Sequence, residues 1–132
     1  MLRPILPFAA LAMLALPGCQ PSAQSSPKPS RAPAARVVGD AQNCIPLNQI
    51  RTSRVHDDST IDFETSGKRL YRNTLPNSCP GLGFEASFIY ETSLSQLCNV
   101  DIIYVLQRTG SMLQRGAGCG LGKFVPIELV KK

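Results

Sequence analysis

The chain has 132 residues, which suits one domain of ordinary size and is too short for two. Aromatic residues make up only 6% of it, so the core must be built mainly from Ile, Leu and Val. Residues 44–132 hold 10 basic and 8 acidic side chains, and this near-balance excludes the strong basic excess of a nucleic-acid-binding domain.

Residues 1–18 have the organisation of a signal peptide. Arg3 precedes an apolar stretch, residues 5–16, which is too short to cross a bilayer but suits the apolar region of an export signal. The next residues, Leu16-Pro17-Gly18-Cys19, resemble the lipobox of bacterial lipoproteins, with Pro17 where Ala, Ser or Thr is usual.

This resemblance implies cleavage before Cys19 and lipidation of its sulfur. Because Gln20 rather than Asp follows Cys19, it also implies delivery to the outer membrane, on its periplasmic side. The membrane is thus an expected partner, through the lipid anchor. The alternative is an ordinary secreted protein whose signal peptide is removed without lipidation.

The cysteine count agrees with lipidation. Five cysteines leave one unpaired in an exported protein, whereas modification of Cys19 leaves four that can form two disulfides. These four are far apart in the chain, unlike the closely spaced pairs of zinc or redox sites, so we expect structural disulfides and no metal.

Residues 19–43 are rich in Pro, Ser and Ala and contain no aromatic side chain. Such a segment cannot bury enough apolar surface to fold, so we expect a disordered linker between the anchor and a domain at 44–132. Its cations, Lys28, Arg31 and Arg36, either keep it soluble or contact anionic lipid.

Residues 44–132 predict an all-β domain, a small antiparallel barrel or a compact sandwich of about six strands stapled by two disulfides. Short segments rich in β-branched and aromatic residues alternate with turn residues, at 50–55, 60–64, 68–73, 84–90, 100–106 and 124–130. We prefer the barrel, because closure removes open sheet edges. Only residues 91–98 and 110–115 suggest short helical turns.

The disulfide pairing follows if these six strands run up and down. Cys44 and Cys98 then lie at one end of the strands, and Cys79 and Cys119 at the other. A strand of six residues is about 20 Å long and a disulfide needs Cα atoms within about 7 Å, so we predict Cys44–Cys98 and Cys79–Cys119.

Two segments suggest chemistry and favour a structural role on closer inspection. His56, Asp57 and Asp58 are adjacent and could serve a hydrolase or a metal, but Val-His-Asp-Asp-Ser-Thr is a typical turn sequence. The glycines of 116–123 suggest a phosphate loop, but their spacing fails and a strand, not a helix, is expected next. We expect them to let the chain turn tightly around the Cys119 disulfide, and we expect no catalytic residue and no cofactor.

The loop at residues 71–82 is the candidate binding site. It is rich in polar side chains, Pro and Gly, and a disulfide at Cys79 fixes its conformation. Arg72 and Asn73 are the polar groups expected to contact a ligand; the alternative is a rigid turn without one.

The order of these features resembles a family of small, uncharacterised exported proteins of Gram-negative bacteria, grouped as a domain of unknown function. The resemblance covers most of residues 44–127 and rests on Cys44-Ile-Pro-Leu, Tyr71-Arg-Asn, Cys79-Pro-Gly-Leu, Leu97-Cys98 and Cys119. It implies export and a fold, and no activity, cofactor or substrate.

Three functions are compatible with the sequence. The leading hypothesis is a non-enzymatic, lipid-anchored module that binds an envelope protein or a glycan. A narrower alternative is an inhibitor of a secreted or host enzyme, as in lysozyme inhibitors. The third is a cell-wall or carbohydrate-active enzyme, which requires paired carboxylates such as Asp62 and Glu91.

Overall fold

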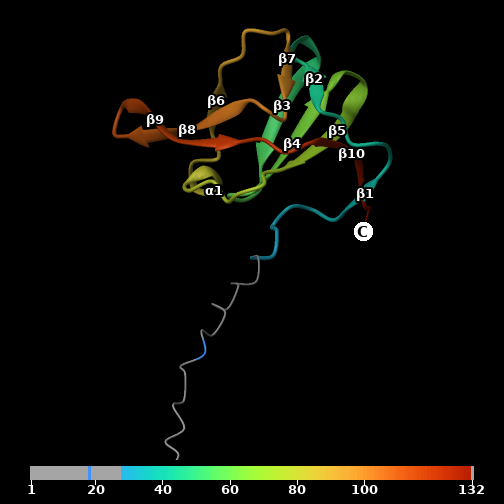
Figure 1. Cartoon of the computed structure of the whole chain (residues 1–132), viewed down its shortest axis with the longest axis horizontal. Helices are drawn as coiled ribbons and strands as arrows, with labels where there is room; N and C mark the ends of the chain where they lie inside the picture. Colours follow the sequence, from blue (N-terminus) through green and yellow to red (C-terminus); the bar gives the residue numbers. More distant parts are fainter. Residues whose placement is uncertain (1–17, 19–27, 132) are drawn as a thin grey trace, which may run out of the picture.

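The computed structural model describes residues 18 and 28–131 (Figure 1). The predicted lipidation site, Cys19, and nearly all of the signal peptide lie outside the described residues. Among the described residues, no helix has the length and apolar character needed to span a membrane.

The described chain consists mostly of short antiparallel strands (Figure 1). One α-helix of four residues, α1 (Leu82–Glu85), and two single-turn 3₁₀ helices, Leu47–Gln49 and Ser66–Lys68, interrupt them. The strands are β1 (Ala35–Val37), β2 (Cys44–Pro46), β3 (Ile50–Val55), β4 (Thr60–Thr65), β5 (Arg69–Thr74), β6 (Phe88–Tyr90), β7 (Gln96–Cys98), β8 (Ile102–Thr109), β9 (Met112–Gly120) and β10 (Phe124–Leu129).

The largest sheet has the order β1-β10-β5-β4-β3, with every pair antiparallel. Side chains alternate along β4, so Ile61 and Phe63 are buried in the core while Asp62 lies on the opposite, outer face. Because Asp62 is opposite Arg72 in the register, the outer face brings their charges together.

The core lies where this sheet meets a three-stranded sheet of order β6-β8-β9. Phe63 of β4 makes edge-to-face contacts with Phe88 of β6 and Phe124 of β10, with ring centroids 6.1 and 5.5 Å apart. Ile103 and Val105 of β8 are buried in the same cluster. Few aromatic rings are needed, because aliphatic side chains complete the core.

The all-β prediction is confirmed, but the described strands are distributed over three sheets rather than joined into one ring. The third sheet pairs only β2 with β7. The structure therefore corresponds to the compact packing of separate sheets that was the alternative to a barrel.

Several local predictions are wrong. Residues 84–90 do not form one strand, because Leu82–Glu85 are helical and β6 begins at Phe88. Neither segment expected to be helical forms a helix: 96–98 form β7 after a bend at 93–95, and 110–115 form the turn and start of β9. Gly110 permits that tight turn with a φ of 63°.

Both predicted disulfides are present. Cys44–Cys98 joins directly paired residues of β2 and β7, and Cys79–Cys119 joins the loop before α1 to β9. Two disulfides are typical of an oxidising, extracytoplasmic compartment. The six-strand meander used to predict the pairing is wrong, because β2 and β7 form a separate small sheet.

The linker predicted at 19–43 is also corrected for its described part. Residues 28–34, called the strap here, lead into β1, which pairs with β10, and Gln42 forms an isolated bridge with Phe124. Arg36 forms an ion pair with Glu128 at 2.5 Å. Residues 28–43 have too few large apolar side chains to form a core. Residues 34–42 are ordered because their backbone groups form hydrogen bonds with the open edge of β10.

Candidate functional site

The turn between β3 and β4 holds the strap through Asp57. One carboxylate oxygen of Asp57 accepts hydrogen bonds from the Ser30 hydroxyl and the Arg31 amide, at 2.8 and 2.9 Å. The other oxygen accepts the Ser59 amide at 2.9 Å. Partial burial raises the pKa of Asp57, but these donors outweigh that effect and lower the pKa to about 2. Asp57 is therefore a fixed anion that orders the strap.

Asp58, the next residue of the turn, holds the opposite side of the site. Its Oδ1 accepts the amide of Gly83 in α1 at 2.7 Å, and its carbonyl accepts the amide of Cys79 at 2.8 Å. The turn thus joins the strap, the disulfide loop and α1.

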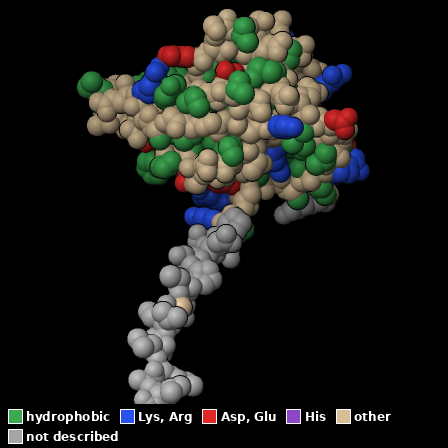
Figure 2. All heavy atoms as spheres, viewed as in Figure 1, with side chains coloured by type: hydrophobic (Ala, Val, Ile, Leu, Met, Phe, Trp, Pro, Cys, Tyr) green, Lys and Arg blue, Asp and Glu red, His purple; other side chains and the backbone are tan. Residues whose placement is uncertain are grey.

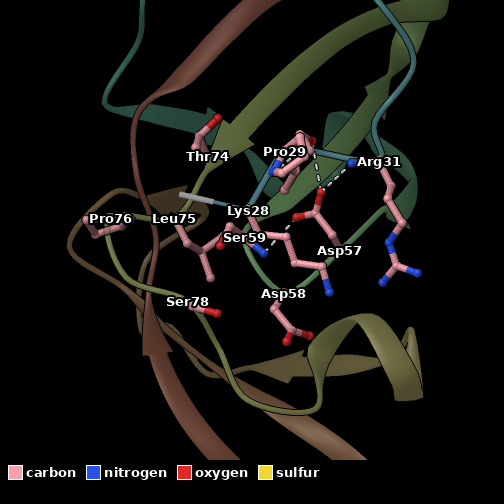
Figure 3. A pocket seen from close by; sticks show the side chains of 12 residues that line it. Lys28, Pro29, Arg31, Asp57, Asp58, Ser59, Thr74, Leu75, Pro76 and Ser78 are labelled. Carbon is pink, nitrogen blue, oxygen red and sulfur yellow. Dashed lines mark hydrogen bonds between the residues drawn. The ribbon is translucent and has the colours of Figure 1, made fainter. Parts of the chain in front are cut away.

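A cavity of about 400 Å³ lies between the strap, the turn at residues 57–60 and residues 74–78 of the disulfide loop (Figure 3). Its apolar lining consists of Pro29 of the strap and of Leu75 and Pro76 of the disulfide loop. Charged side chains and hydroxyls form the remainder: Lys28, Ser30, Arg31, Asp57, Asp58, Ser59, Thr60, Thr74 and Ser78. Its volume lies within the usual range of small-ligand sites.

A second hollow of about 600 Å³ lies over β5 and β10, between residues 38–42 and residues 67–71. Glu128 in its lining is paired with Arg36 at the surface, whereas the side chains of Asp40, Lys68 and Arg69 are exposed and form no hydrogen bond among the described residues. We therefore take the smaller cavity, with its ordered turn, as the candidate functional site.

His56 and Arg72 converge on Asp62 at the outer face of the large sheet. His56 Nε2 lies 2.9 Å from one carboxylate oxygen, and Arg72 donates to both oxygens at 2.8 and 2.9 Å. These hydrogen bonds to Asp62 raise the pKa of Arg72. The side chain of Asp62 is only 6% exposed, so this group is a largely buried ion cluster.

This geometry corrects the prediction for Arg72. It belongs to β5 rather than to a loop, and its guanidinium is committed to Asp62 instead of being presented to a ligand. The antiparallel β4–β5 hairpin places residues 62 and 72 opposite each other. A correct prediction of this strand register would have revealed the Asp62–Arg72 pair.

Asn73 is also corrected, because its side chain is fully buried in β5. Its amide nitrogen donates to the Gly122 carbonyl at 2.7 Å, and its oxygen accepts the Gly122 amide at 2.8 Å. Both ends of the side-chain amide are hydrogen-bonded to Gly122, so Asn73 holds the β9–β10 connection in place and has no exposed polar group to offer a ligand.

The glycine-rich segment has a structural role that differs from the predicted tight turn. Gly116, Gly118 and Gly120 lie within β9, where the ring of Tyr104 approaches Gly118. Gly122 follows the strand, and a Cβ there would lie 2.1 Å from the carbonyl oxygen of Thr74. Glycine at 122 permits this close approach of two backbones.

The residues considered for catalysis are kept apart. Asp62 is bound by His56 and Arg72, whereas Glu91 forms an ion pair with Arg115 of the other large sheet. His56, Asp57 and Asp58 also diverge, toward Asp62, the strap and α1 respectively. Within the described ranges, no three His, Cys, Asp or Glu side chains are grouped as a metal site.

Sequence reasoning identified the 56–59 turn but missed the cavity beside it. Two of its charged side chains, Lys28 and Arg31, belong to the segment predicted to be a disordered linker. The contact is formed by Ser30 and Arg31, which donate hydrogen bonds to Asp57. Because Arg31 and Asp57 are 26 residues apart in the chain, no local sequence pattern reveals this contact.

Comparison of the chain with protein-family models, with curated proteins and with solved structures finds no match. The resemblance of this chain to a family of small exported proteins therefore stays a prediction.

Proposed function

We propose that this protein is a non-enzymatic binding module of the cell envelope, anchored in the outer membrane by lipidated Cys19, and that the strap cavity is its ligand site. The observation that carries the proposal is the position of the cavity. It is built in part from Lys28 to Arg31, which lie close in sequence to Cys19.

The short spacing to Cys19 supports a site at the membrane surface. Eight residues, 20–27, separate Cys19 from Lys28. Even fully extended, that connection spans only about 30 Å. An anchor at Cys19 would therefore hold the cavity close to the lipid headgroups.

The state of the polar side chains supports binding rather than catalysis. The best acid–base pair among the described residues is His56 with Asp62, but Arg72 donates hydrogen bonds to the Asp62 carboxylate and balances its negative charge. The side chain of His56 forms no other hydrogen bond within the described residues. A general base needs a substrate or nucleophile within hydrogen-bond reach. The cavity, by contrast, has ordered walls before any ligand arrives, which reduces the entropy lost on binding.

An enzyme inhibitor is the second candidate, and one feature favours it. The β8–β9 hairpin extends beyond its sheet (Figure 1), and Met112 and Leu113 at its tip are 63% and 53% exposed. An exposed apolar hairpin suits insertion into the cleft of another protein. If this candidate holds, Leu113→Asp abolishes inhibition of the target enzyme while Leu94→Asp, at another exposed leucine, leaves it unchanged.

The anchoring part of the proposal is tested by Cys19→Ala in a Gram-negative host fed radioactive palmitate. We expect the parent protein to be labelled and to fractionate with the outer membrane, and the variant to lose both properties. Ser22→Ala, which leaves the Leu16–Cys19 sequence intact, is the control. An unchanged distribution of Cys19→Ala would contradict lipid anchoring.

The ligand site is tested by placing a photo-cross-linking amino acid at Ser78, beside the cavity, and at Ser53 on the exposed strand β3. We expect a ligand adduct from position 78 only, and its loss when Asp57→Asn disturbs the strap. Equal adducts from both positions would place the binding site elsewhere.

A further inference from the structure

The strap cavity carries balanced charges of both signs. Lys28 and Arg31 supply two cations, and Asp57 and Asp58 supply two anions. A purely anionic ligand meets two carboxylates there, and a purely cationic ligand meets two basic groups. A ligand that carries both charges a few ångströms apart fits this arrangement better.

Only part of this charge is available to a ligand. Asp57 uses both oxygens to hold the strap and the turn. Asp58 uses Oδ1 for Gly83, whereas its Oδ2 has no hydrogen-bond partner among residues 28–131. Lys28 likewise forms no ion pair within that range. The Lys28 ammonium, the Arg31 guanidinium and Asp58 Oδ2 are therefore unpaired within that range, and the free groups considered below are those of Lys28 and Asp58, because the side chain of Lys28 runs toward Asp58.

The free groups lie on the same side of the cavity. Figure 3 shows the side chain of Lys28 running toward Asp58, whereas the guanidinium of Arg31 points away from the apolar wall formed by Leu75 and Pro76. Figure 2 shows basic and acidic side chains side by side at the lower edge of the domain, where the strap lies in the same view in Figure 1. A phosphate beside Lys28 can receive further hydrogen bonds from hydroxyls such as Ser59.

The occupant follows from the short length of chain between the cavity and the proposed anchor at Cys19. Given the anchor of the proposed function, the residues between Cys19 and Lys28 hold the cavity within about 30 Å of the acyl chain. The molecules present at highest local concentration are then membrane lipids. Among headgroups, phosphoethanolamine combines a phosphate with a primary ammonium that can donate hydrogen bonds.

We infer that the strap cavity binds a phosphoethanolamine headgroup of the membrane, with Lys28 on the phosphate and Asp58 Oδ2 on the ammonium. The apolar wall of Pro29, Leu75 and Pro76 contacts the glycerol portion. The inference rests on the proposed anchor for the source of the ligand, and the chemistry of recognition is independent of it.

The first experiment titrates the full mature protein in maltoside micelles with glycerophosphoethanolamine, followed by amide chemical shifts. Glycerol 3-phosphate lacks the ammonium, and glycerophosphocholine has a methylated one that cannot donate. We expect both to bind about tenfold more weakly, because each lacks one charge-assisted hydrogen bond. Equal binding of all three compounds, or no binding of any, overturns the inference.

Two substitutions test the assigned roles. In Asp58→Asn the side-chain oxygen can still accept the Gly83 amide, so the fold is retained while the anion is lost; we expect the preference for glycerophosphoethanolamine over glycerol 3-phosphate to disappear. Lys28→Gln should weaken binding of both compounds. Lys131→Gln, a matched change of an exposed lysine that does not line the cavity, should change neither. Unchanged binding in Asp58→Asn overturns the assignment of the ammonium.

A vesicle experiment tests the source of the headgroup. The anchored protein is placed in vesicles of phosphatidylethanolamine or phosphatidylcholine, each with the same share of phosphatidylglycerol, and Lys28 is methylated. Protection of Lys28 in phosphatidylethanolamine only supports the inference, and equal reactivity overturns membrane lipid as the source. Because the soluble titration needs no anchor, a failure of Cys19 lipidation is seen separately by palmitate labelling.

Discussion

At the scale of single residues, the functional region depends on side chains that satisfy backbone groups far away in the chain. Asp57 accepts the amide of Arg31, and Asp58 accepts that of Gly83. Asn73 donates to the Gly122 carbonyl and accepts the Gly122 amide. Each replaces hydrogen bonds that regular secondary structure would provide in a larger protein. The polar residues that seemed free for chemistry in the sequence are largely consumed in this way.

The Asp57 carboxylate makes docking of the strap dependent on pH. Its pKa falls from 3.8 to about 2 in the folded protein, so its stabilisation is complete above about pH 4 and is lost as the pH falls toward 2. The effect is about 1 kcal/mol, because the group is partly exposed and solvent screens it. Hydrogen exchange of the Arg31 amide between pH 5 and pH 2, corrected for the intrinsic rate, measures it. Asp57→Asn should remove the pH dependence, and a pH dependence retained in that variant would assign the effect to another group.

Gly122 and Gly120 form a matched pair for testing close backbone approach. A Cβ at 122 would collide with the Thr74 carbonyl, whereas a Cβ at 120 meets no atom within 4 Å. Gly122→Ala should break the Asn73 clamp and cost about 2–4 kcal/mol of unfolding free energy, while Gly120→Ala should cost less than about 1 kcal/mol. Urea denaturation measures both, and similar losses would show that position 122 adjusts without strain.

At the scale of elements, the strap and β1 together close the open edge of the large sheet. β10 is otherwise an edge strand, and an unprotected edge invites pairing with other chains. The Ala34 carbonyl accepts the Val130 amide, and the Val38 amide donates to the Pro126 carbonyl, so β1 is held at both ends. The cavity exists because this short strand brings the strap across the sheet.

Removal of the backbone N–H of residue 38 should therefore release β1 and the strap from β10. Val38→Pro deletes the donor to Pro126, and we expect native-state trypsin to cleave after Arg36 several-fold faster. Val38→Ala retains the amide at an exposed position and serves as the control. Rapid cleavage after Arg36 in the parent protein would instead support the original expectation of a free linker up to residue 43.

At the scale of the whole molecule, two disulfides join small sheets that share a limited core. Cys79 is completely buried and ties the site loop to β9, whereas Cys44–Cys98 reinforces strands that are already hydrogen-bonded. The two bonds enclose chain segments of similar length, with sequence separations of 40 and 54, so the chain-entropy model gives them similar effects. Their surroundings differ.

We expect the two double alanine variants to differ in stability. Loss of either disulfide should cost about 2–4 kcal/mol, and the Cys79→Ala/Cys119→Ala variant should be the less stable, because it also leaves a cavity in the core. Denaturation midpoints under oxidising conditions measure this difference. The reverse order would show that the β2–β7 pair, rather than the site loop, limits stability.

The strands β3, β4 and β5 were largely predictable, because their alternating side chains and turn residues are local signals. β2 and β7 were missed because three-residue strands have no detectable period, and β9 because its glycines resembled a loop. For the site, the turn at His56–Ser59 was recognised, but the roles of Arg72 and Asn73 were not. Those roles depend on Asp62 and Gly122, which only strand register and chain reversal bring to them.

The sequence by itself determined the even number of cysteines after Cys19 and the β periodicity of the domain, and it predicts an export signal; all of these are features that act over a few residues. The tertiary structure alone decided which segment covers the edge of β10 and where a cavity forms. The physical reason is that unpaired backbone groups select a partner by proximity, not composition, and β1 reaches β10 from about 90 residues away in the chain. A segment with the composition of a linker thereby became one wall of the candidate site.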